Sequence, residues 1–418
     1  MNKVLIVTYY WPPGGGAGVQ RWLKFAKFLP EFGWEPLILT VDPEYAAYPV
    51  TDTSLEKEIG WNIAVHRTQA TDWFRIYSSD KSRIPSAGFA SNPGKSVKDK
   101  LSRFIRGNFF IPDPRRGWNR YAFDRACEII EKEKIVTFVT TSPPHSTQLI
   151  GLKLKKKYPF IKWIADLRDP WTDIYYYDQF YPTWLSKKID GGYERSVMQK
   201  ADSIITVGFM LKDLFSKKLT GISSKIEVIT NGFDESDFKN IPNAEPERFT
   251  ITYAGTLSEK YPINGFLNAM SELKMKTDFL LRFVGRMPEN IRQQIAMSVP
   301  SGSLQFIPYC HHYEAIRYLV NSSLLLLIIP DAGDNRLIIT GKIYEYFASC
   351  RPILCLGPKD GEAAALISRQ QAGACFDYDD AENIVKYILE TKDHPVNLEN
   401  DQSEFSRRNL TKKLVSLL

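Results

Sequence analysis

The stretch KVLIVTYYWPPGGGAGVQRW, Lys3–Trp22, decides the fold class. Its first part, KVLIVTYY, is a continuous apolar run, which is typical of a strand buried on both faces of a parallel sheet. Four glycines in the five positions 14–18 follow, and apolar residues then recur at helical spacing until Gly33. A strand, a glycine-rich turn and a helix in this order predict the start of a doubly wound α/β domain.

Strand and helix patterns alternate along the rest of the chain and restart after a polar, proline-containing segment, Lys239–Arg248. Buried strands are predicted at 35–42, 135–142, 162–169, 203–208 and 226–232, and again at 249–256, 280–286, 304–309, 324–330 and 352–357. Helices are predicted at 146–157, 185–201, 264–274, 290–298, 313–321, 341–349, 361–368 and 403–418. The pattern therefore predicts two α/β domains, residues 1–238 and 239–402.

Composition and targeting signals place the chain among globular proteins. Its 418 residues include 54 basic and 48 acidic ones and are 44% hydrophobic, which allows sizeable cores and favours anionic partners. The five cysteines are scattered without a CxxC pair, so neither a disulfide framework nor a zinc site is expected. No signal peptide is recognisable, and the longest apolar run, Leu324–Pro330, is too short to span a bilayer. We predict a cytoplasmic location.

The glycine loop after the first strand admits three interpretations. A dinucleotide fingerprint needs a third glycine, but Val19 and Arg21 stand at the two positions where it would fall. Glycines between a first strand and a helix favour binding of an anion or sugar hydroxyls, with Gly15 and Gly16 as the central candidates. The third interpretation is a strand–helix turn without a ligand.

His145 follows one further predicted strand and Asp169 lies at the carboxyl end of another, at the same edge of the sheet. In TTSPPHSTQ, the prolines end the strand and Ser146 is placed to cap the next helix. A histidine there binds a sugar hydroxyl or phosphate, or acts as a base, unless it only packs on the prolines. In ADLRDPWTD, Asp166 and Asp169 bind acceptor hydroxyls or form an ion pair with Arg168. We take His145 and Asp169 as the catalytic candidates.

The stretch NRLIITGKIYEYFASCRPILCLGP, Asn335–Pro358, predicts a diphosphate site in the second domain. Thr340 is placed to cap a helix whose first turn holds Gly341 and Lys342, so that N–H groups, the helix dipole and a cation coincide. Glu345 shares a helix face with Lys342 and is placed to accept two ribose hydroxyls; the alternative is a surface Lys–Glu pair. No P-loop, zinc-protease or nucleophile-elbow motif occurs, and no metal site is predicted.

These stretches together resemble the GT-B glycosyltransferases of the large retaining family that uses nucleotide sugars (glycosyltransferase family 4-like). The resemblance runs from residue 1 to 418 and rests on the glycine loop, SPPHS, ADLRDPW, ADSIITVG, ITNGFD, YAGTL, FVGR and KIYEYFASCRPIL. It implies two Rossmann-like domains facing a cleft, with the nucleotide in the C-terminal domain and the acceptor in the N-terminal domain. It also implies that the last helix, 403–418, packs back on the N-terminal domain.

The resemblance assigns roles to single residues. Gly16 and its neighbours would face the donor phosphate or sugar, and His145 would contact the transferred sugar. Gly255 would lie where a turn approaches the diphosphate. Glu345 would hold the ribose, and the backbone at Tyr309 would bind the base.

The chain departs from the family pattern at two positions. Leu337 replaces the first glutamate of the E-x7-E motif, so the usual contact to the donor sugar is missing or comes from another group. Thr256, expected beside the diphosphate, stands where the family commonly has a basic residue. Three cations are placed to supply that charge: Lys260, Arg286 and Lys342.

The resulting expectation is an enzyme that moves a sugar from a nucleoside-diphosphate sugar to the hydroxyl of a saccharide or lipid-linked acceptor. The resemblance implies retention of configuration, no required metal, no cofactor beyond the donor, and a role in surface polysaccharide or glycolipid synthesis. Two alternatives remain: a nucleotide-sugar epimerase of similar fold, and a non-catalytic nucleotide-sugar-binding protein. Nucleic acid is not an expected partner, because no binding motif accompanies the basic charge.

Residues 75–120 form an insert that we predict to be irregular. Basic and aromatic residues are interleaved in it, which suits an anionic membrane surface or a lipid-diphosphate acceptor; the alternative is a solvated loop. These residues are Lys95, Lys98, Lys100, Arg103, Arg106, Arg115, Arg116 and Arg120, with Phe104, Phe109, Phe110 and Trp118. We predict weak peripheral binding at the inner face of a membrane.

Overall fold

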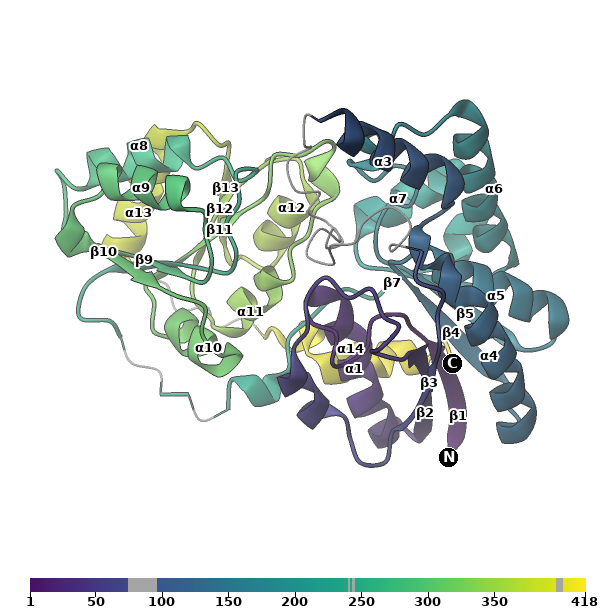
Figure 1. Ribbon diagram of the computed structural model, residues 1–418. Helices are drawn as coiled ribbons and strands as arrows, with labels where there is room; N and C mark the ends of the chain where they lie inside the picture. Colours follow the sequence, from purple (N-terminus) through teal and green to yellow (C-terminus); the bar gives the residue numbers. More distant parts are fainter. Residues whose placement is uncertain (74–95, 240, 243–244, 396–400) are drawn as a thin grey trace. The chain divides into compact units, whose positions relative to one another are not determined.

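The computed structural model describes residues 1–73, 96–239, 241–242, 245–395 and 401–418 (Figure 1). Over these residues the chain divides into two compact units. The first consists of Met1–Thr230 and Arg407–Leu418, and the second of Asn231–Ser406. Each unit has its own parallel sheet and its own buried hydrophobic clusters, so the predicted α/β fold of two doubly wound domains is confirmed.

The first unit is built on a seven-stranded parallel sheet in the order β3-β2-β1-β4-β5-β6-β7. The strands are β1 (Asn2–Val7), β2 (Trp34–Val41), β3 (Ala64–Thr68), β4 (Thr137–Ser142), β5 (Lys162–Leu167), β6 (Ser203–Thr206) and β7 (Ile226–Val228). The strand order reverses between β1 and β4, which pair directly. Ligands of open α/β sheets bind at the carboxyl ends of the strands at such a reversal. The glycine loop follows β1 and the SPPHS loop follows β4, so both lie there.

The helices of the first unit are α1 (Ala17–Phe28), α3 (Val97–Phe109), α4 (Asn119–Glu133), α5 (Ser146–Lys157), α6 (Trp184–Lys200), α7 (Phe209–Lys218) and α14 (Arg407–Val415). Figure 1 shows α14 beside α1, and the two helices are in contact. Leu410 and Leu414 of α14 are buried in the core of the first unit. The last helix is therefore an integral part of that unit.

The second unit has a six-stranded parallel sheet in the order β10-β9-β8-β11-β12-β13. Its strands are β8 (Thr250–Ala254), β9 (Leu280–Val284), β10 (Leu304–Ile307), β11 (Leu324–Ile328), β12 (Ile353–Leu356) and β13 (Gly373–Phe376). Its helices are α8 (Asn264–Leu273), α9 (Glu289–Ser298), α10 (His312–Val320), α11 (Lys342–Ala348), α12 (Glu362–Arg369) and α13 (Ala381–Asp393). The order reverses between β8 and β11, so the predicted diphosphate segments lie beside that reversal.

The sequence pattern misses the outer strands β3 and β13. β3 is an edge strand with no fully buried residue, and β13 is an edge strand whose four residues are all half-buried. Neither gives the continuous apolar run that marks a strand covered on both faces. The central strands carry that run, and all of them are predicted.

The prediction of an irregular insert at 75–120 is wrong for its second half, because α3 lies there. No α3 residue is fully buried, and the prediction overlooked the helical spacing of its apolar residues among the many basic ones. Trp118 and Arg115 are only 1% and 7% exposed and cannot form part of a membrane-facing surface. Residues 74–95, with Lys95 among them, lie outside the described residues.

Candidate active site

A glycine and a cation meet in the second unit where its strand order reverses. Gly255 follows β8 with φ 127°, and a Cβ at this position would lie 2.5 Å from Lys342 Nζ. The absence of a side chain at Gly255 therefore makes room for the lysine at the start of α11. Both residues are predicted to bind the diphosphate, and the structure brings them into contact.

The Lys342 ammonium is held over an aromatic ring. Its Nζ donates to Tyr253 Oη at 2.6 Å and lies 4.2 Å from the centre of the Tyr253 ring. Tyr253 Oη in turn donates to the Thr256 carbonyl at 2.9 Å. Burial lowers the pKa of Lys342 to about 7, although the Glu345 carboxylate partly offsets this. An anionic ligand would stabilise the protonated amine and raise its pKa again.

Glu345, the predicted ribose-binding residue, is paired with a histidine that sequence reasoning missed. His312 Nε2 lies 3.0 Å from Glu345 Oε1, and His312 Nδ1 lies 3.8 Å from Asp237 Oδ2. The Glu345 side chain keeps 34% of its surface exposed, so a ligand can reach it. His312 begins α10, a separate helix, and lies 33 residues before Glu345 in the chain. No sequence pattern links two residues at that separation.

Arg286 and Tyr309 form a second pair of predicted residues. They follow β9 and β10, and the Arg286 guanidinium carbon lies 4.7 Å from the centre of the Tyr309 ring. Tyr309 is 65% exposed, so its ring and backbone are accessible to a base. Lys260 lies farther along the loop after β8, where its carbonyl accepts from Asp331 N–H at 2.8 Å and burial lowers the pKa of its amine.

The predicted helix cap at Thr340 is wrong. α11 begins at Lys342, and Gly341 takes the cap position without a side-chain hydrogen bond. Because the helix starts later than predicted, Thr340 Oγ1 is buried without a hydrogen-bond partner among the described residues. Gly341 has φ −58° and open space where a Cβ would stand, so a larger residue fits there.

Leu337 ends a short 3-10 turn, Asn335–Leu337, and is half-buried.

The glycine loop of the first unit uses part of its backbone internally. Gly15 N–H donates to the Val50 carbonyl at 2.9 Å, so this amide is already satisfied. Gly16 is exposed, has φ 85° and stands at the cap of α1. Arg168 Nη1 donates to the Gly18 carbonyl at 3.2 Å, and its Nε binds the last carbonyl of β4. Of the two predicted glycines, Gly16 is the one open to a ligand.

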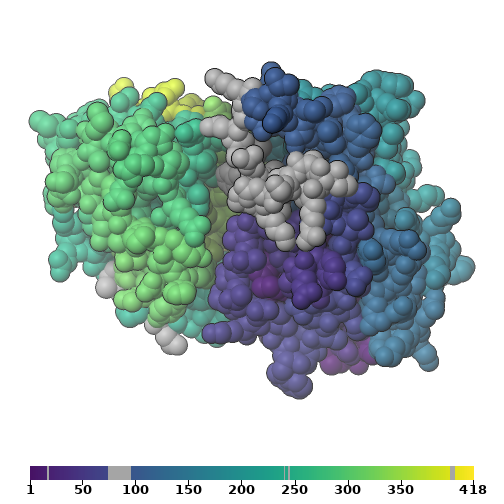
Figure 2. Space-filling model, viewed as in Figure 1, coloured from purple at the N-terminus to yellow at the C-terminus, as the bar shows by residue number. Residues whose placement is uncertain are grey.

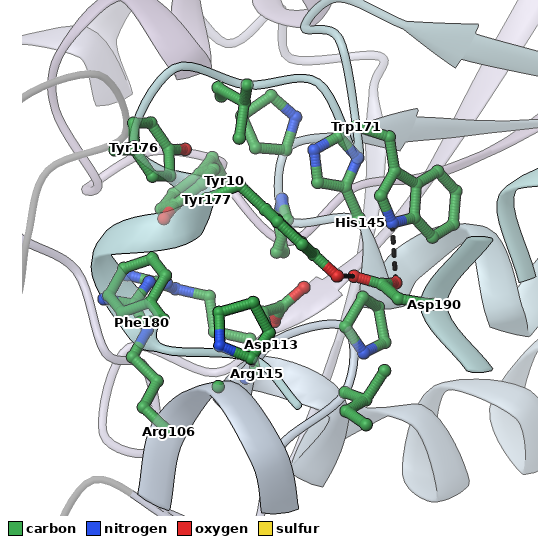
Figure 3. A pocket seen from close by; sticks show the side chains of 17 residues that line it. Tyr10, Arg106, Asp113, Arg115, His145, Trp171, Tyr176, Tyr177, Phe180 and Asp190 are labelled. Atoms are coloured by element: carbon green, nitrogen blue, oxygen red, sulfur yellow. Dashed lines mark hydrogen bonds between the residues drawn. The ribbon is translucent and has the colours of Figure 1, made fainter. Parts of the chain in front are cut away.

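A pocket of about 880 Å³, counting its open mouth, lies within the first unit (Figure 3). In Figure 3, His145, Trp171 and Asp190 stand on one side of it, with Phe180 and Arg106 on the other. Aromatic and proline side chains supply most of the remaining wall: Tyr10, Pro112, Pro143, Pro144, Tyr176, Tyr177 and Pro182. Many apolar faces with a few polar groups are typical of a small-molecule site.

His145 is a neutral side chain of this pocket whose ring nitrogens are not used by the described residues. Its ring stacks on Trp171 with centres 4.7 Å apart and planes 16° from parallel. Burial, reinforced by the charges of Arg168 and Lys218, lowers its pKa to about 3. Both ring nitrogens are buried without a hydrogen-bond partner in the described part of the chain. A histidine of this pKa is a weak base at neutral pH, but it can donate to one ligand atom and accept from another.

Asp190, a pocket residue that sequence reasoning missed, accepts a hydrogen bond from the indole N–H of Trp171. Its two carboxylate oxygens accept from Trp171 Nε1 at 2.8 Å and from Tyr177 Oη at 3.0 Å. Burial raises the pKa of Asp190 to about 6, although both hydrogen bonds lower it. Asp190 lies inside α6, where the sequence gives only an acidic residue in a helix.

Asp169 and Asp166 have different surroundings from those expected. Asp169 is not among the described residues that line the pocket, and burial raises the pKa of its carboxyl. The structure therefore does not bring Asp169 and His145 together in the pocket, although they follow the neighbouring strands β5 and β4. Asp166 belongs to a buried ion pair, as one interpretation of the sequence expects, but Arg21 at 3.2 Å is a closer partner than Arg168 at 3.9 Å.

Two absences within the described ranges bear on the site. No group of three or more His, Cys, Asp or Glu side chains in them is arranged to hold a metal ion. Within the same ranges, every helix is too short or too polar to cross a membrane.

Comparisons with known proteins bear on the fold. No protein-family model and no curated protein matches the chain. Among solved structures, the chain is similar to HepE from Anabaena in complex with UDP, at 13% identity and a TM-score of 0.64, over 99% of this chain and 98% of HepE. Sucrose-phosphate synthase from Thermosynechococcus elongatus matches at 12% identity and a TM-score of 0.64, over 100% and 98% of the two chains. WaaG, a glycosyltransferase involved in lipopolysaccharide biosynthesis, matches at 11% identity and a TM-score of 0.58, over 99% of each chain. The likeness covers both units, and the chain has the GT-B fold of these glycosyltransferases.

Proposed function

We propose that the protein is a glycosyltransferase that moves a sugar from a nucleoside-diphosphate sugar to an acceptor hydroxyl. The observation that carries the proposal is the Lys342 ammonium, which lies against Gly255 where the strand order reverses and has a pKa of about 7. A desolvated cation at this point of an α/β sheet suits a diphosphate. HepE, solved in complex with UDP and with UDP and glucose, supports a nucleotide-sugar donor.

In the proposed reaction, the bond between the sugar and the diphosphate breaks while the acceptor oxygen bonds to the same sugar carbon. Negative charge develops on the leaving diphosphate, where Lys342 stabilises it. The pocket of the first unit receives the acceptor, and His145 hydrogen-bonds a sugar hydroxyl without changing its protonation state. The proton of the acceptor hydroxyl passes to the oxygen of the leaving diphosphate, because Asp169, the other catalytic candidate, does not line the pocket that receives the acceptor.

The finer parts of the proposal rest on the family resemblance and on one similar structure. Retention of configuration, independence of a metal and the absence of a cofactor are proposed from the family resemblance. A role in surface polysaccharide or glycolipid synthesis is supported by WaaG, a glycosyltransferase involved in lipopolysaccharide biosynthesis.

Thermal unfolding with UDP-, GDP- and ADP-sugars tests donor binding. A ligand at about 100 times its dissociation constant should stabilise the folded protein by about 2.7 kcal/mol. We expect a shift with one nucleotide class, and its loss in Glu345→Ala, because Glu345 is proposed to hold the ribose. Glu382→Ala, at an exposed position on α13 in the same unit, is the matched control and should keep the shift. If no nucleotide sugar shifts the wild type, the proposed donor site is wrong.

Product analysis separates the proposal from its two alternatives. Sugar transfer releases a nucleoside diphosphate, and its rate depends on an acceptor. An epimerase would return an isomeric nucleotide sugar without acceptor, and a binding protein would return the donor unchanged. Leu337, in place of a donor-sugar carboxylate, makes the last outcome worth testing.

His145→Phe should lower the transfer rate roughly tenfold to a hundredfold while leaving donor affinity unchanged, because one or two hydrogen bonds to a sugar are lost. The phenyl ring can still stack on Trp171, so folding is preserved. The rate should be measured at saturating donor, beside the dissociation constant of the donor. Since His145 has a pKa of about 3, the wild-type rate should show no transition from this residue between about pH 5 and 9. An unchanged rate in His145→Phe would remove His145 from the reaction.

A further inference from the structure

Helix α3 presents an apolar stripe to solvent. Val97, Leu101 and Phe104 follow the i, i+4, i+7 spacing that puts residues on one helix face. They are 82%, 58% and 39% exposed, respectively. Large apolar side chains that line up on an exposed face are more informative than single ones, because scattered exposed apolar residues are normal.

The first two turns of α6 carry a second group of exposed apolar side chains. Trp184, Leu185 and Ile189 are 74%, 57% and 39% exposed. α3 and α6 are in contact, and Figure 1 shows both on the same side of the first unit. We call the six residues of the two groups the α3–α6 face.

Asn108 fixes the two helices to each other. Its Nδ2 donates to the Tyr181 carbonyl at 3.0 Å, while its Oδ1 accepts from Thr183 N–H at 2.7 Å and from Ser186 Oγ at 2.8 Å. Gly107 lets α3 come close, since a Cβ there would overlap the Phe180 carbonyl. The exposed stripe is therefore part of a packed arrangement, and not of an unattached helix.

Basic side chains surround the apolar residues. α3 contains Lys98, Lys100, Arg103 and Arg106 against a single acidic residue, Asp99. On α6, Lys187 is paired with Asp178, and the Lys188 ammonium lies 5.0 Å from the centre of the Trp184 ring. The face therefore combines apolar anchors with a net positive rim.

We propose that the α3–α6 face docks on the surface of an anionic lipid bilayer. Exposed Trp, Phe and Leu with lysines beside them are suited to the headgroup boundary, where the rings enter the apolar edge and the lysines meet lipid phosphates. Protein interfaces are depleted of lysine, whereas four of the six basic residues on α3 and the first two turns of α6 are lysines: Lys98, Lys100, Lys187 and Lys188, with Arg103 and Arg106 the other two. The charge thus favours a bilayer over a second copy of the chain or another protein.

Docking by this face would put the pocket of the first unit at the lipid surface. Arg106 and Gly107 of α3 and Phe180 and Pro182 before α6 line that pocket. The acceptor would then be a saccharide or phosphate head attached to a lipid. This last step rests on the proposed glycosyltransferase function; the docking itself does not.

Vesicle co-sedimentation of the full chain tests docking. We expect binding to vesicles of phosphatidylcholine and phosphatidylglycerol at low salt, and weak or no binding to phosphatidylcholine alone. Trp184→Ser with Leu101→Ser should weaken binding by about tenfold or more, since two large side chains leave the bilayer. Lys98→Glu, Lys100→Glu and Lys188→Glu together should lower it by at least about tenfold and remove its salt dependence.

Two matched controls lie in the same unit. Trp61→Ser removes a tryptophan that is 99% exposed but far along the chain from α3 and α6, and Lys156→Glu reverses an exposed lysine on α5. Both should bind vesicles like the wild type. Absence of binding to anionic vesicles, or equal loss in the controls and the face variants, would overturn the proposal. So would a dimer in sedimentation velocity that Trp184→Ser dissociates.

Vesicle binding and the thermal shift with a nucleotide sugar test docking and the proposed function separately. The thermal shift with a nucleotide sugar depends on the second unit, so it should persist in every variant of the α3–α6 face. A protein that binds nucleotide sugars but not vesicles would refute docking alone. A protein that binds vesicles but no nucleotide sugar would refute the proposed function and leave docking in place.

Discussion

Lys342→Met should weaken binding of the donor nucleotide sugar by roughly tenfold to a hundredfold. A hydrogen bond to a charged group contributes about 1.5–3 kcal/mol, and Lys342 supplies the cation that lies against Gly255. Methionine fills a similar volume without the charge. Because burial already disfavours the ammonium, its removal should leave the free protein at least as stable as the wild type. Isothermal titration of the variant, with thermal unfolding of the free protein beside it, measures both effects.

The same residue should make donor binding depend on pH. The protonated amine binds the diphosphate and the neutral amine does not, so affinity is highest below the pKa of about 7 and falls as pH rises. Above pH 7 the loss should approach about tenfold per pH unit, until the higher pKa of the bound amine is reached. At pH 7 binding should take up about half a proton, which titrations in buffers of different ionisation enthalpy detect.

Lys342→Arg is the control for this pH dependence. Arginine stays charged over the whole range, so any affinity that remains should be flat between about pH 6 and 9. The diphosphate of a nucleotide sugar is fully ionised there, so the ligand itself contributes no slope. A wild-type affinity that does not change with pH, without proton uptake, would mean that Lys342 does not contact the donor.

Lys342 and Glu345, which we propose bind the donor, could be expected to lie together from the sequence because they are close along the chain. They lie within one turn of the same short helix. Gly255 could be predicted separately, because YAGT places it directly after a strand whose residues are all buried. The error at Thr340 is a boundary error: the helix starts later than the cap pattern suggests, so the hydroxyl has no N–H group to accept from. Local patterns predict which segment forms a site more reliably than which atom is used.

The pocket of the first unit could not be predicted in the same way. Its walls come from residues as distant in the chain as Tyr10 and Asp190, and only His145 carries a local signal. Asp190 looks like an ordinary helical carboxylate until Trp171 and Tyr177 are seen to donate to it. Its raised pKa results from burial, which depends on the whole fold. The same holds for His312, whose partner Glu345 belongs to another helix.

Asp166→Asn should destabilise the first unit by about 3–5 kcal/mol, the usual effect of removing one partner of a buried ion pair. Asp166 and Arg21 have no exposed side-chain surface. One Asp166 oxygen accepts from Arg21, and the other accepts from Trp22 Nε1 and Thr141 Oγ1, each at 2.7 Å. An asparagine would leave the arginine charge uncompensated and point an N–H group at one of these donors. Denaturant unfolding measures the loss, and a control at the exposed pair Arg125–Glu128, Glu128→Gln, should cost less than about 1 kcal/mol.

The expected loss is large because this network joins three parts of the first unit. Arg21 comes from α1, directly after the glycine loop, and Asp166 comes from β5. Arg21 also donates to the carbonyls of Ile229 and Thr230 at 2.8 Å each, where the chain leaves this unit. In Asp166→Asn the position of α1, and with it that of Gly16, is no longer fixed by a charge. Donor affinity of the second unit should nevertheless persist where the variant is folded, because Lys342 and Glu345 lie on α11, which packs into a separate hydrophobic cluster of the second unit. A cost below about 1 kcal/mol would mean that Arg21 is held by the two carbonyls and not by Asp166.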